Sequence, residues 1–263
     1  MTDARLELAV QNHVAVVTLA RADKHNALDP PMLDAIIAMT DRLQHERGVR
    51  AVVLNGAGRS FCSGLDFPAI VAAGGLEAFS DLLSEPVPNR FQRVAFGWLQ
   101  LPMPVICAIH GSCLGGGLQI ALAADIRIAA PDAQLSVMEG RWGLIPDMSI
   151  TRTLPRLVGI DVAKELTYTA RIVTGAEASR LGLVTRLAED PLEASLELAE
   201  EIAAHSPDAV RRAKRLFDQS WTEPAAQTLA LEADLQGELI GTPNQMAALS
   251  AGLNRQKPSF ADP

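Results

Sequence analysis

Three consecutive glycines occur in the stretch HGSCLGGGLQIALAADIRI, residues 110–128, and they restrict what this part of the chain can form. They lie between an apolar run typical of a buried strand and a run that favours a helix. Backbone N–H groups at the start of a helix have no partner within it and carry the positive end of its dipole. Glycines there can therefore present donors to a negative oxygen, although close packing of a strand on a helix is the structural alternative.

A second glycine loop, GRSFCSGLDF at residues 58–67, also follows a predicted strand. Two loops that leave neighbouring strands at the same end of a sheet can direct two N–H groups at one point. Such a pair of donors is an oxyanion hole, which stabilises the negative charge that develops on a carbonyl oxygen. The second loop therefore favours the functional interpretation of the first.

The chain of 263 residues is 48% hydrophobic and carries a formal net charge of −8. This apolar content is enough for one compact domain with a smaller appendage. The negative charge argues against a nucleic-acid surface, which needs clustered Lys and Arg. The three cysteines form no CxxC pair, and we find neither a secretory signal nor an apolar run long enough to cross a bilayer. We therefore expect a cytoplasmic protein with free thiols that acts on small molecules.

The order of the predicted elements repeats. Residues 5–10 and 14–20 read as a hairpin, and a helix capped by Asp29 follows within residues 29–48. The strand, loop and helix order then recurs, with further short strands near residues 125–130, 134–137 and 183–187. From about residue 191 the pattern is helical, with Pro207, Pro224 and Pro243 at first turns. We predict a core over residues 1–190 and a helical C-terminal region over residues 191–263.

The two loops and their surroundings resemble one known family. The segments RSFCSGLD, PVICAIHGSCLGGGLQIALAADIRIA, AQLSVMEGRWGLIPD and TLPRLVG together resemble the crotonase superfamily, also called the enoyl-CoA hydratase/isomerase family. The resemblance implies an α/β fold, a ClpP-like spiral of ββα units with a helical C-terminal trimerisation region. It also implies a homotrimer or hexamer that binds acyl-CoA thioesters, with coenzyme A as part of the substrate and no separate cofactor.

The resemblance also assigns roles to residues of this chain. The oxyanion hole of the family corresponds to the backbone N–H groups of Leu65 and Gly116. RADKHNALD looks like the turn that contacts CoA in the family, and GLNRQKPSF looks like the family's C-terminal end. The candidate substrate-binding residues are Lys24, Ala27, Cys62, Gly64, Asp66, Gly115, Trp142 and Lys257. The structural alternatives are solvated surface lysines, small apolar filling by Cys62, and packing by Trp142.

The acid–base residues depart from the hydratase pattern. Family hydratases use two glutamates, and here the matching positions are Gln119 and Glu139. A carboxamide cannot take up a proton at neutral pH. GLIPDMS supplies Asp147 instead, and the pair of Glu139 and Asp147 resembles dienoyl-CoA isomerases of the family. Asp147 has a structural alternative as the cap of the predicted helix MSITRTLPRLV.

Three functions remain open from the sequence. The favoured one is double-bond isomerisation that uses Glu139 and Asp147. The alternatives are hydration with Glu139 as sole acid and base while Gln119 orients water, and a catalytically silent protein that binds acyl-CoA. A serine hydrolase is disfavoured because the chain has no GxSxG motif, and the histidines lack the spacing of metal ligands.

Overall fold

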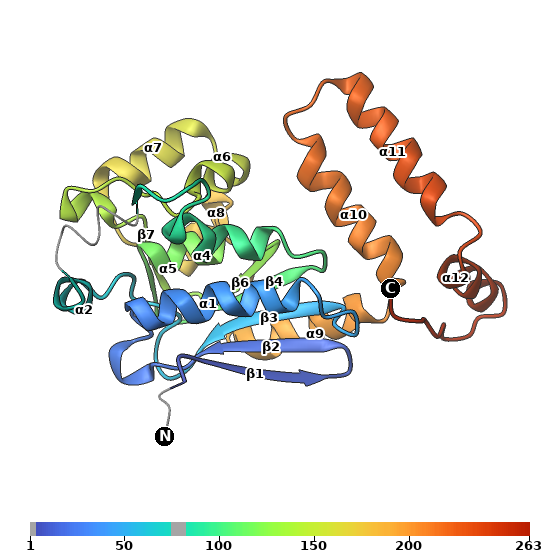
Figure 1. The fold of residues 1–263 in the computed structure, drawn as a ribbon, viewed down its shortest axis with the longest axis horizontal. Helices are drawn as coiled ribbons and strands as arrows, with labels where there is room; N and C mark the ends of the chain where they lie inside the picture. Colours follow the sequence, from blue (N-terminus) through green and yellow to red (C-terminus); the bar gives the residue numbers. More distant parts are fainter. Residues whose placement is uncertain (1–3, 75–82) are drawn as a thin grey trace.

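The computed structural model describes residues 4–74 and 83–263 (Figure 1). The strands are β1 Leu6–Gln11, β2 Val14–Leu19, β3 Ala51–Gly56, β4 Val105–Ile109, β5 Ser112–Leu114, β6 Ile126–Ala129, β7 Gln134–Ser136, β8 Val173–Thr174 and β9 Arg186–Leu187. The helices up to β9 are α1 Pro30–Leu43, α2 Phe67–Ala72, α4 Arg90–Leu99, α5 Gly116–Leu122, α6 Leu154–Leu157, α7 Ile160–Thr169 and α8 Gly175–Leu181. Short 3₁₀ helices are η1 Ala22–Lys24, η2 Glu139–Trp142 and η3 Ile150–Arg152.

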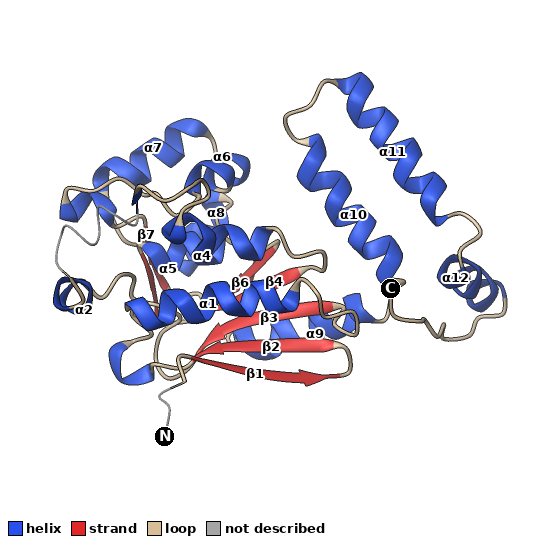
Figure 2. Cartoon of the chain, in the orientation of Figure 1, coloured by secondary structure: helices blue, strands red, loops and turns tan. Residues whose placement is uncertain are grey.

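The strands form two sheets (Figure 2). The larger has the order β1-β2-β3-β4-β6-β9, with an antiparallel β1–β2 hairpin and parallel pairing from β2 onward. The smaller has the order β5-β7-β8. The predicted hairpin is confirmed, and the repeated strand-and-helix order builds the α/β spiral.

Both faces of the larger sheet are covered, as its apolar central strands require. Val52 and Leu54 of β3 belong to the main hydrophobic core together with residues of α1, α4 and α5. Val53, between them, faces the opposite way and packs with Ala199 and Ala203 of α9 (Pro191–Ala203). The alternation of side chains along the strand therefore places helices on both sides of the sheet.

Helix α1 begins as its sequence predicts. The Met32 N–H donates to Asp29 Oδ1 at 2.9 Å, so the Asp29 side chain caps the helix. Pro30 follows at the first helical position, where a missing N–H costs nothing. The Asp29 side chain also holds the chain segment before β1, because Arg5 Nη2 donates to Asp29 Oδ2 at 2.7 Å.

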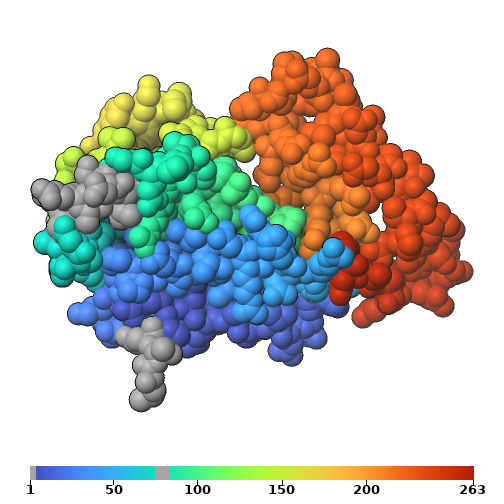
Figure 3. Space-filling view, in the orientation of Figure 1, coloured from blue at the N-terminus to red at the C-terminus, as the bar shows by residue number. Residues whose placement is uncertain are grey.

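The last three helices stand apart from the core and are called the C-terminal helices below. They are α10 Pro207–Ser220, α11 Ala225–Leu239 and α12 Pro243–Leu253. Pro207 and Pro243 lie in first turns as predicted, whereas Pro224 is the N-cap residue of α11. Figure 3 shows a cleft between α10 and the core. The predicted boundary between residues 190 and 191 falls at the start of α9, whereas packing places α9 with the core.

Among the described residues, the structure has no helix with the length and apolar character needed to span a membrane.

Candidate active site

The two glycine loops, residues 57–66 and 110–117, meet at the edge where β3 and β4 end. The Cys62 N–H donates to Ser112 O at 3.0 Å and the Leu114 N–H donates to Cys62 O at 3.0 Å, so the loops pair like short parallel strands. Gly64 has a φ of +91°, and a Cβ atom placed there would lie 2.9 Å from Leu114 O. Only glycine permits this combination of backbone conformation and close approach.

The first loop is also held from the turn before α1. The Leu28 N–H donates to Gly64 O at 2.8 Å, and the Asp66 N–H donates to Leu28 O at 3.0 Å. The N–H of Leu65, between these two residues, points to the opposite side of this short parallel pairing. The turn that resembles the family's CoA-contacting segment thus fixes the orientation of the Leu65 amide.

Leu65 and Gly116 line the same cavity. Within residues 4–74 and 83–263, no backbone hydrogen bond of a loop or turn has the N–H of Leu65 or of Gly116 as its donor. Gly116 is the first residue of α5, so its N–H has no partner within the helix. Both residues line a cavity of about 90 Å³. This arrangement can hold a developing negative oxygen, and the oxyanion hole itself stays a prediction.

The three consecutive glycines serve three different needs. Gly115 has a φ of +52°, and a Cβ atom on it would lie 3.3 Å from Glu139 Oε1. A Cβ on Gly116 would lie 2.8 Å from Met148 Sδ. A Cβ on Gly117 would lie 2.5 Å from Cys62 O, so this glycine lets α5 pack directly on the first loop. Both interpretations of the glycine run therefore apply, each to different residues.

Glu139 lines the same cavity as Leu65 and Gly116, and one of its carboxylate oxygens has no hydrogen-bond partner among the described residues. Its side chain is 8% exposed and lines the cavity. Gln119 Nε2 donates to Glu139 Oε1 at 2.6 Å. Glu139 Oε2 is buried and has no hydrogen-bond partner among the described residues. Burial raises the pKa of Glu139, the hydrogen bond from Gln119 opposes this rise, and the negative charge of Asp147 adds to it. A carboxylate in this environment is suited to exchange protons.

Gln119 does not reach the cavity. It is 1% exposed, and its Oε1 accepts a hydrogen bond from the Met148 N–H at 2.8 Å. Gln119 is absent from the residues that line the cavity. The alternative in which Gln119 orients a water beside the substrate is not supported by this placement.

Asp147 is half-buried, its charge acts on Glu139, and burial raises its pKa. Like Gln119, it is absent from the residues that line the cavity. The proposed role as a helix cap is wrong. The segment after it forms η3 with Ser149 as N-cap and then α6 with Thr153 as N-cap, and neither helix has a side-chain cap hydrogen bond. Ser149 has a φ of 64°, which breaks the predicted continuous helix. The capping explanation for Asp147 is therefore removed.

The other predicted residues of the first loop and the early turn have structural partners. Asp66 caps α2 and pairs with Arg21 Nη1 at 2.7 Å. Burial alone would raise the pKa of Asp66, but the Arg21 hydrogen bond, the Ala69 N–H and the charges of Arg21 and Lys24 together lower it. Ala27 O accepts from Arg21 Nη1 at 3.0 Å, and Lys24 is exposed in η1.

Cys62 belongs to the first loop, and its side chain faces Gly117 rather than the cavity. Burial raises the pKa of its thiol to about 12, and the thiol donates to Asn26 O. This is the placement expected for small apolar filling, the structural alternative for this residue. Sequence reasoning missed Asn26, whose Nδ2 donates to Ser60 O at 2.8 Å and to Phe61 O at 3.1 Å. An asparagine in a turn was the available signal, because asparagine tolerates the left-handed backbone found here, with a φ of 55°.

Trp142 lines the cavity, and its ring has a partner that the sequence analysis missed. Its ring lies 4.8 Å from the ring of Phe67, centroid to centroid, with a tilt of 42°. Trp142 is 61% exposed, so the pair forms an apolar rim at the mouth of the cavity. Lys257 lies in the exposed tail beyond α12. Figure 1 shows α12 and α2 on opposite sides of the molecule.

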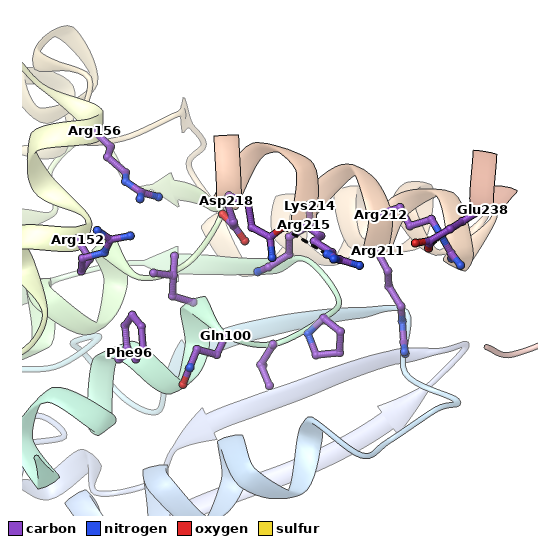
Figure 4. A pocket seen from close by; sticks show the side chains of 14 residues that line it. Phe96, Gln100, Arg152, Arg156, Arg211, Arg212, Lys214, Arg215, Asp218 and Glu238 are labelled. Atoms are coloured by element: carbon purple, nitrogen blue, oxygen red, sulfur yellow. Dashed lines mark hydrogen bonds and ion pairs between the residues drawn. The ribbon is translucent and has the colours of Figure 1, made fainter. Parts of the chain in front are cut away.

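A larger cavity of about 630 Å³ lies between α10 and the core (Figure 4). Its basic lining residues are Arg152, Arg156, Arg211, Arg212, Lys214 and Arg215. Part of this charge is neutralised, since Arg212 pairs with Glu238 at 3.0 Å and Lys214 pairs with Asp125 at 2.6 Å. The large cavity shares no lining residue with the cavity at the glycine loops, so it is a separate feature.

Comparison with known proteins agrees with the geometry. Residues 9–263 match the family model described as enoyl-CoA hydratase/isomerase. The chain is 33% identical over 254 residues to a short-chain-enoyl-CoA hydratase of Clostridium acetobutylicum, covering 95% of each protein. It is 31% identical over 266 residues to the mitochondrial Delta(3,5)-Delta(2,4)-dienoyl-CoA isomerase of Pongo abelii, covering 95% of this chain and 79% of that protein.

The fold has close solved counterparts. The crystal structure of an enoyl-CoA hydratase from Bacillus anthracis matches with a TM-score of 0.91 and 32% identity, covering 97% of this chain and 98% of that chain. The chain therefore belongs to the enoyl-CoA hydratase/isomerase family and has the crotonase fold. It is an enzyme of this family.

Proposed function

We propose that this enzyme moves the double bond of an enoyl-CoA thioester, with Glu139 and Asp147 as the proton-transferring groups. The observation that carries the proposal is the unpartnered Oε2 of Glu139, which belongs to a residue lining the same cavity as Leu65 and Gly116. Asp147 is the second acid, because its charge acts on Glu139 and its own carboxyl has a raised pKa. Gln119 cannot be the second acid of a two-carboxylate hydratase.

The proposed reaction balances within these groups. Glu139 removes a proton from C2 of a 3-enoyl thioester, and the electron pair moves into the carbonyl to form an enolate. The amides of Leu65 and Gly116 stabilise the enolate oxygen, an effect worth about 3 kcal/mol for one such donor in other enzymes. The enolate then collapses, the double bond forms between C2 and C3, and protonated Asp147 donates a proton to C4. The two carboxyls exchange one proton before the next turnover.

The cavity fits only the reacting end of the substrate. Its volume of about 90 Å³ is space for about three water molecules. The pantetheine and nucleotide parts of coenzyme A therefore lie outside it, and we place them toward the turn that carries Lys24. No separate cofactor is needed, since the thioester itself supplies the electron sink.

Hydration is the second candidate, and the names of relatives favour it. The 33% identical protein of Clostridium acetobutylicum is a short-chain-enoyl-CoA hydratase, and the 32% identical chain from Bacillus anthracis is an enoyl-CoA hydratase. In that case Glu139 alone activates water at C3 and returns the proton to C2. The unpartnered Oε2 of Glu139 speaks against a catalytically silent binder in both cases.

The deciding experiment compares Glu139→Gln and Asp147→Asn with the wild type on 3-enoyl-CoA, 2-enoyl-CoA and dienoyl-CoA. Absorbance follows conjugation of the thioester, and mass follows addition of water. We expect Glu139→Gln to lower all turnover by about 10²–10⁴-fold, the usual contribution of a general acid or base. We expect Asp147→Asn to stop double-bond migration while thioester binding is kept. Migration that survives Asp147→Asn contradicts the two-acid scheme, and water addition as the main reaction favours the hydratase.

We also propose that copies of the chain assemble as trimers or as hexamers built from two trimers. Supporting this, an apolar groove of about 550 Å³ runs along α10 and is lined in part by Phe217 and Trp221. These two side chains are 72% and 61% exposed in the single chain. Light scattering on Phe217→Asp should show smaller assemblies than the wild type, whereas Val10→Asp on the outer strand β1 should leave the mass unchanged.

A further inference from the structure

Gln119 connects two parts of the candidate active site through its side-chain amide. Its Oε1 accepts from the Met148 N–H at 2.8 Å, and its Nε2 donates to Glu139 Oε1 at 2.6 Å. A backbone N–H can only donate, so the amide oxygen must face Met148 and the NH₂ group must face Glu139. The orientation of the amide is therefore fixed by its partners rather than by an arbitrary assignment.

This connection makes the two oxygens of Glu139 different. Oε1 is engaged by Gln119 and lies against the second loop, where a Cβ on Gly115 would come within 3.3 Å of it. Oε2 has no partner among the described residues. A carboxylate held by one oxygen cannot rotate freely, and its free oxygen is the one available to accept a proton.

The hydrogen bond also stabilises the ionised form of Glu139. Burial raises the pKa of this carboxyl, while donation from the Gln119 amide lowers it. A glutamate at position 119 would have the opposite effect. Two carboxyls at 2.6 Å cannot both be ionised, so they would share one proton and one of them would hold it tightly.

We propose that Gln119 is a positioning residue that selects Oε2 of Glu139 as the proton-accepting atom and, by supplying no second carboxyl, restricts the site to proton transfer along the acyl chain. Met148 takes part through its main chain, since its N–H holds the amide in place. The proposal deepens the proposed function and rests on it. Its positioning step is tested below by a measurement that does not depend on which net reaction the enzyme performs.

The test uses three variants and the exchange of the substrate α-proton with heavy water. Gln119→Leu removes both hydrogen bonds while keeping a side chain of similar size, and Gln119→Glu keeps the side-chain shape. The matched control is Gln236→Leu, at an exposed position of α11. The pH dependence of kcat/KM reports the pKa of the essential base in the free enzyme. Thermal unfolding of each variant establishes that the fold is kept.

The exchange profile is the rate of α-proton exchange against pH, and its acid limb is the part in which the rate falls as Glu139 becomes protonated. For Gln119→Leu we expect this acid limb to move to higher pH. Exchange on the acid side falls by about tenfold for each unit of displacement, and the alkaline plateau and KM change less. A purely structural role would lower the plateau at every pH and leave the limb in place, which overturns the proposal. Gln236→Leu should leave the profile unchanged.

Gln119→Glu keeps the proposal testable if the leucine variant does not fold. We expect a displaced acid limb and a gain of water addition relative to double-bond migration. An unchanged profile with an unchanged product ratio overturns the proposal. Failure of the proposed function would show separately, as water addition without double-bond migration by the wild type. The displacement of the acid limb of the exchange profile would still be measurable in that case.

Discussion

Glycines have opposite surroundings in the two glycine loops and in the C-terminal helices. A Cβ on Gly117 would lie 2.5 Å from Cys62 O, whereas Cβ atoms on Gly237 of α11 and Gly252 of α12 would meet nothing within 4 Å. In the loops, backbone approaches backbone, and the approach sets the positions of two amides. In the C-terminal helices, no close contact requires a glycine at these two positions. Sequence composition alone does not reveal this difference, because it depends on what lies opposite.

The two regions are also attached differently. The loops are joined by backbone hydrogen bonds and contribute Phe61, Cys62 and Cys113 to the main core. Helix α10 is attached to the core by side chains, through Lys214 with Asp125 at 2.6 Å and through Arg211 Nη2, which donates to Val49 O at 3.1 Å. We therefore expect substitutions in the loops to disturb stability and activity together, and substitutions in the C-terminal helices to disturb attachment or stability alone.

Gly117→Ala should have the largest effect. The new methyl group meets a backbone oxygen that no side-chain rotation can remove, so α5 must move away from the first loop. Overpacking of this kind costs about 3 kcal/mol of folding free energy. A displacement of about 1 Å at the Gly116 amide can lower turnover by about 10²-fold. Urea unfolding and thioester turnover measure the two effects, and a fully active, fully stable variant would contradict the close approach.

Lys214→Met should weaken the attachment of α10. The Lys214 side chain is 6% exposed and its partner Asp125 is 23% exposed, so the pair is largely shielded from water. The variant keeps the apolar stem but removes this cation from Asp125, which still accepts from the Val105 N–H at 2.7 Å. We expect a loss of about 1–3 kcal/mol. A double-mutant cycle with Asp125→Asn in urea unfolding isolates the contribution of the pair.

Arg212→Met is the control for this prediction on the same helix. Arg212 pairs with Glu238 of α11, which is 48% exposed, so the pair joins two C-terminal helices and does not reach the core. Exposed pairs contribute about 0.2–1 kcal/mol. An equal loss for Arg212→Met and Lys214→Met would show that attachment to the core does not depend on the Lys214–Asp125 pair.

The pH dependence of stability should distinguish the site from the rest of the molecule. Burial raises the pKa of Glu139, so the folded protein binds this proton more tightly than the unfolded chain. Stability contributed by the group is present below the unfolded pKa and is lost as the pH rises through the folded pKa. Glu139→Gln should therefore be more stable than the wild type at pH 7, although inactive. The difference in unfolding free energy should shrink as the pH falls from 7 through the raised pKa of folded Glu139 toward the ordinary range of a glutamate, below which it should stay constant. A difference that does not change between pH 7 and that range would contradict a buried, costly carboxylate.

The sequence predicted the features that depend on local pattern. The hairpin, the Asp29 cap and the two glycine loops follow from alternation, capping chemistry and the conformational needs of glycine. The meeting of the two glycine loops was also predicted, because loops that leave neighbouring parallel strands share one edge of the sheet. Leu65 and Gly116 themselves entered through the family resemblance, and both line one cavity. Glu139 entered through the family resemblance, since a lone glutamate in a loop has no local signature.

Features that depend on distant partners were not predicted. The hydrogen bond from the Met148 N–H to Gln119 joins residues 29 apart, and nothing in either segment indicates the other. Asp147 was compatible with a cap until Ser149, with a φ of 64°, ended the expected helix. The helical pattern after about residue 191 predicted α9 as a helix but did not show that it packs against the sheet. Periodicity reports which side is buried, and the partner comes from the tertiary fold.

Gly237→Ala should have the smallest effect and the opposite sign. The residue lies within α11, where glycine is less favourable than alanine by about 0.8–1 kcal/mol because it gains more backbone freedom on unfolding. The added methyl group meets no atom within 4 Å, so nothing offsets this gain. We expect stabilisation of about 0.5–1 kcal/mol with unchanged turnover. Gly237→Ala and Gly117→Ala together compare the two regions directly. The same added methyl group should stabilise the C-terminal helices and destabilise the glycine loops. A loss of stability on Gly237→Ala would mean that this face of α11 is covered in solution, as it would be if another copy of the chain packed against it.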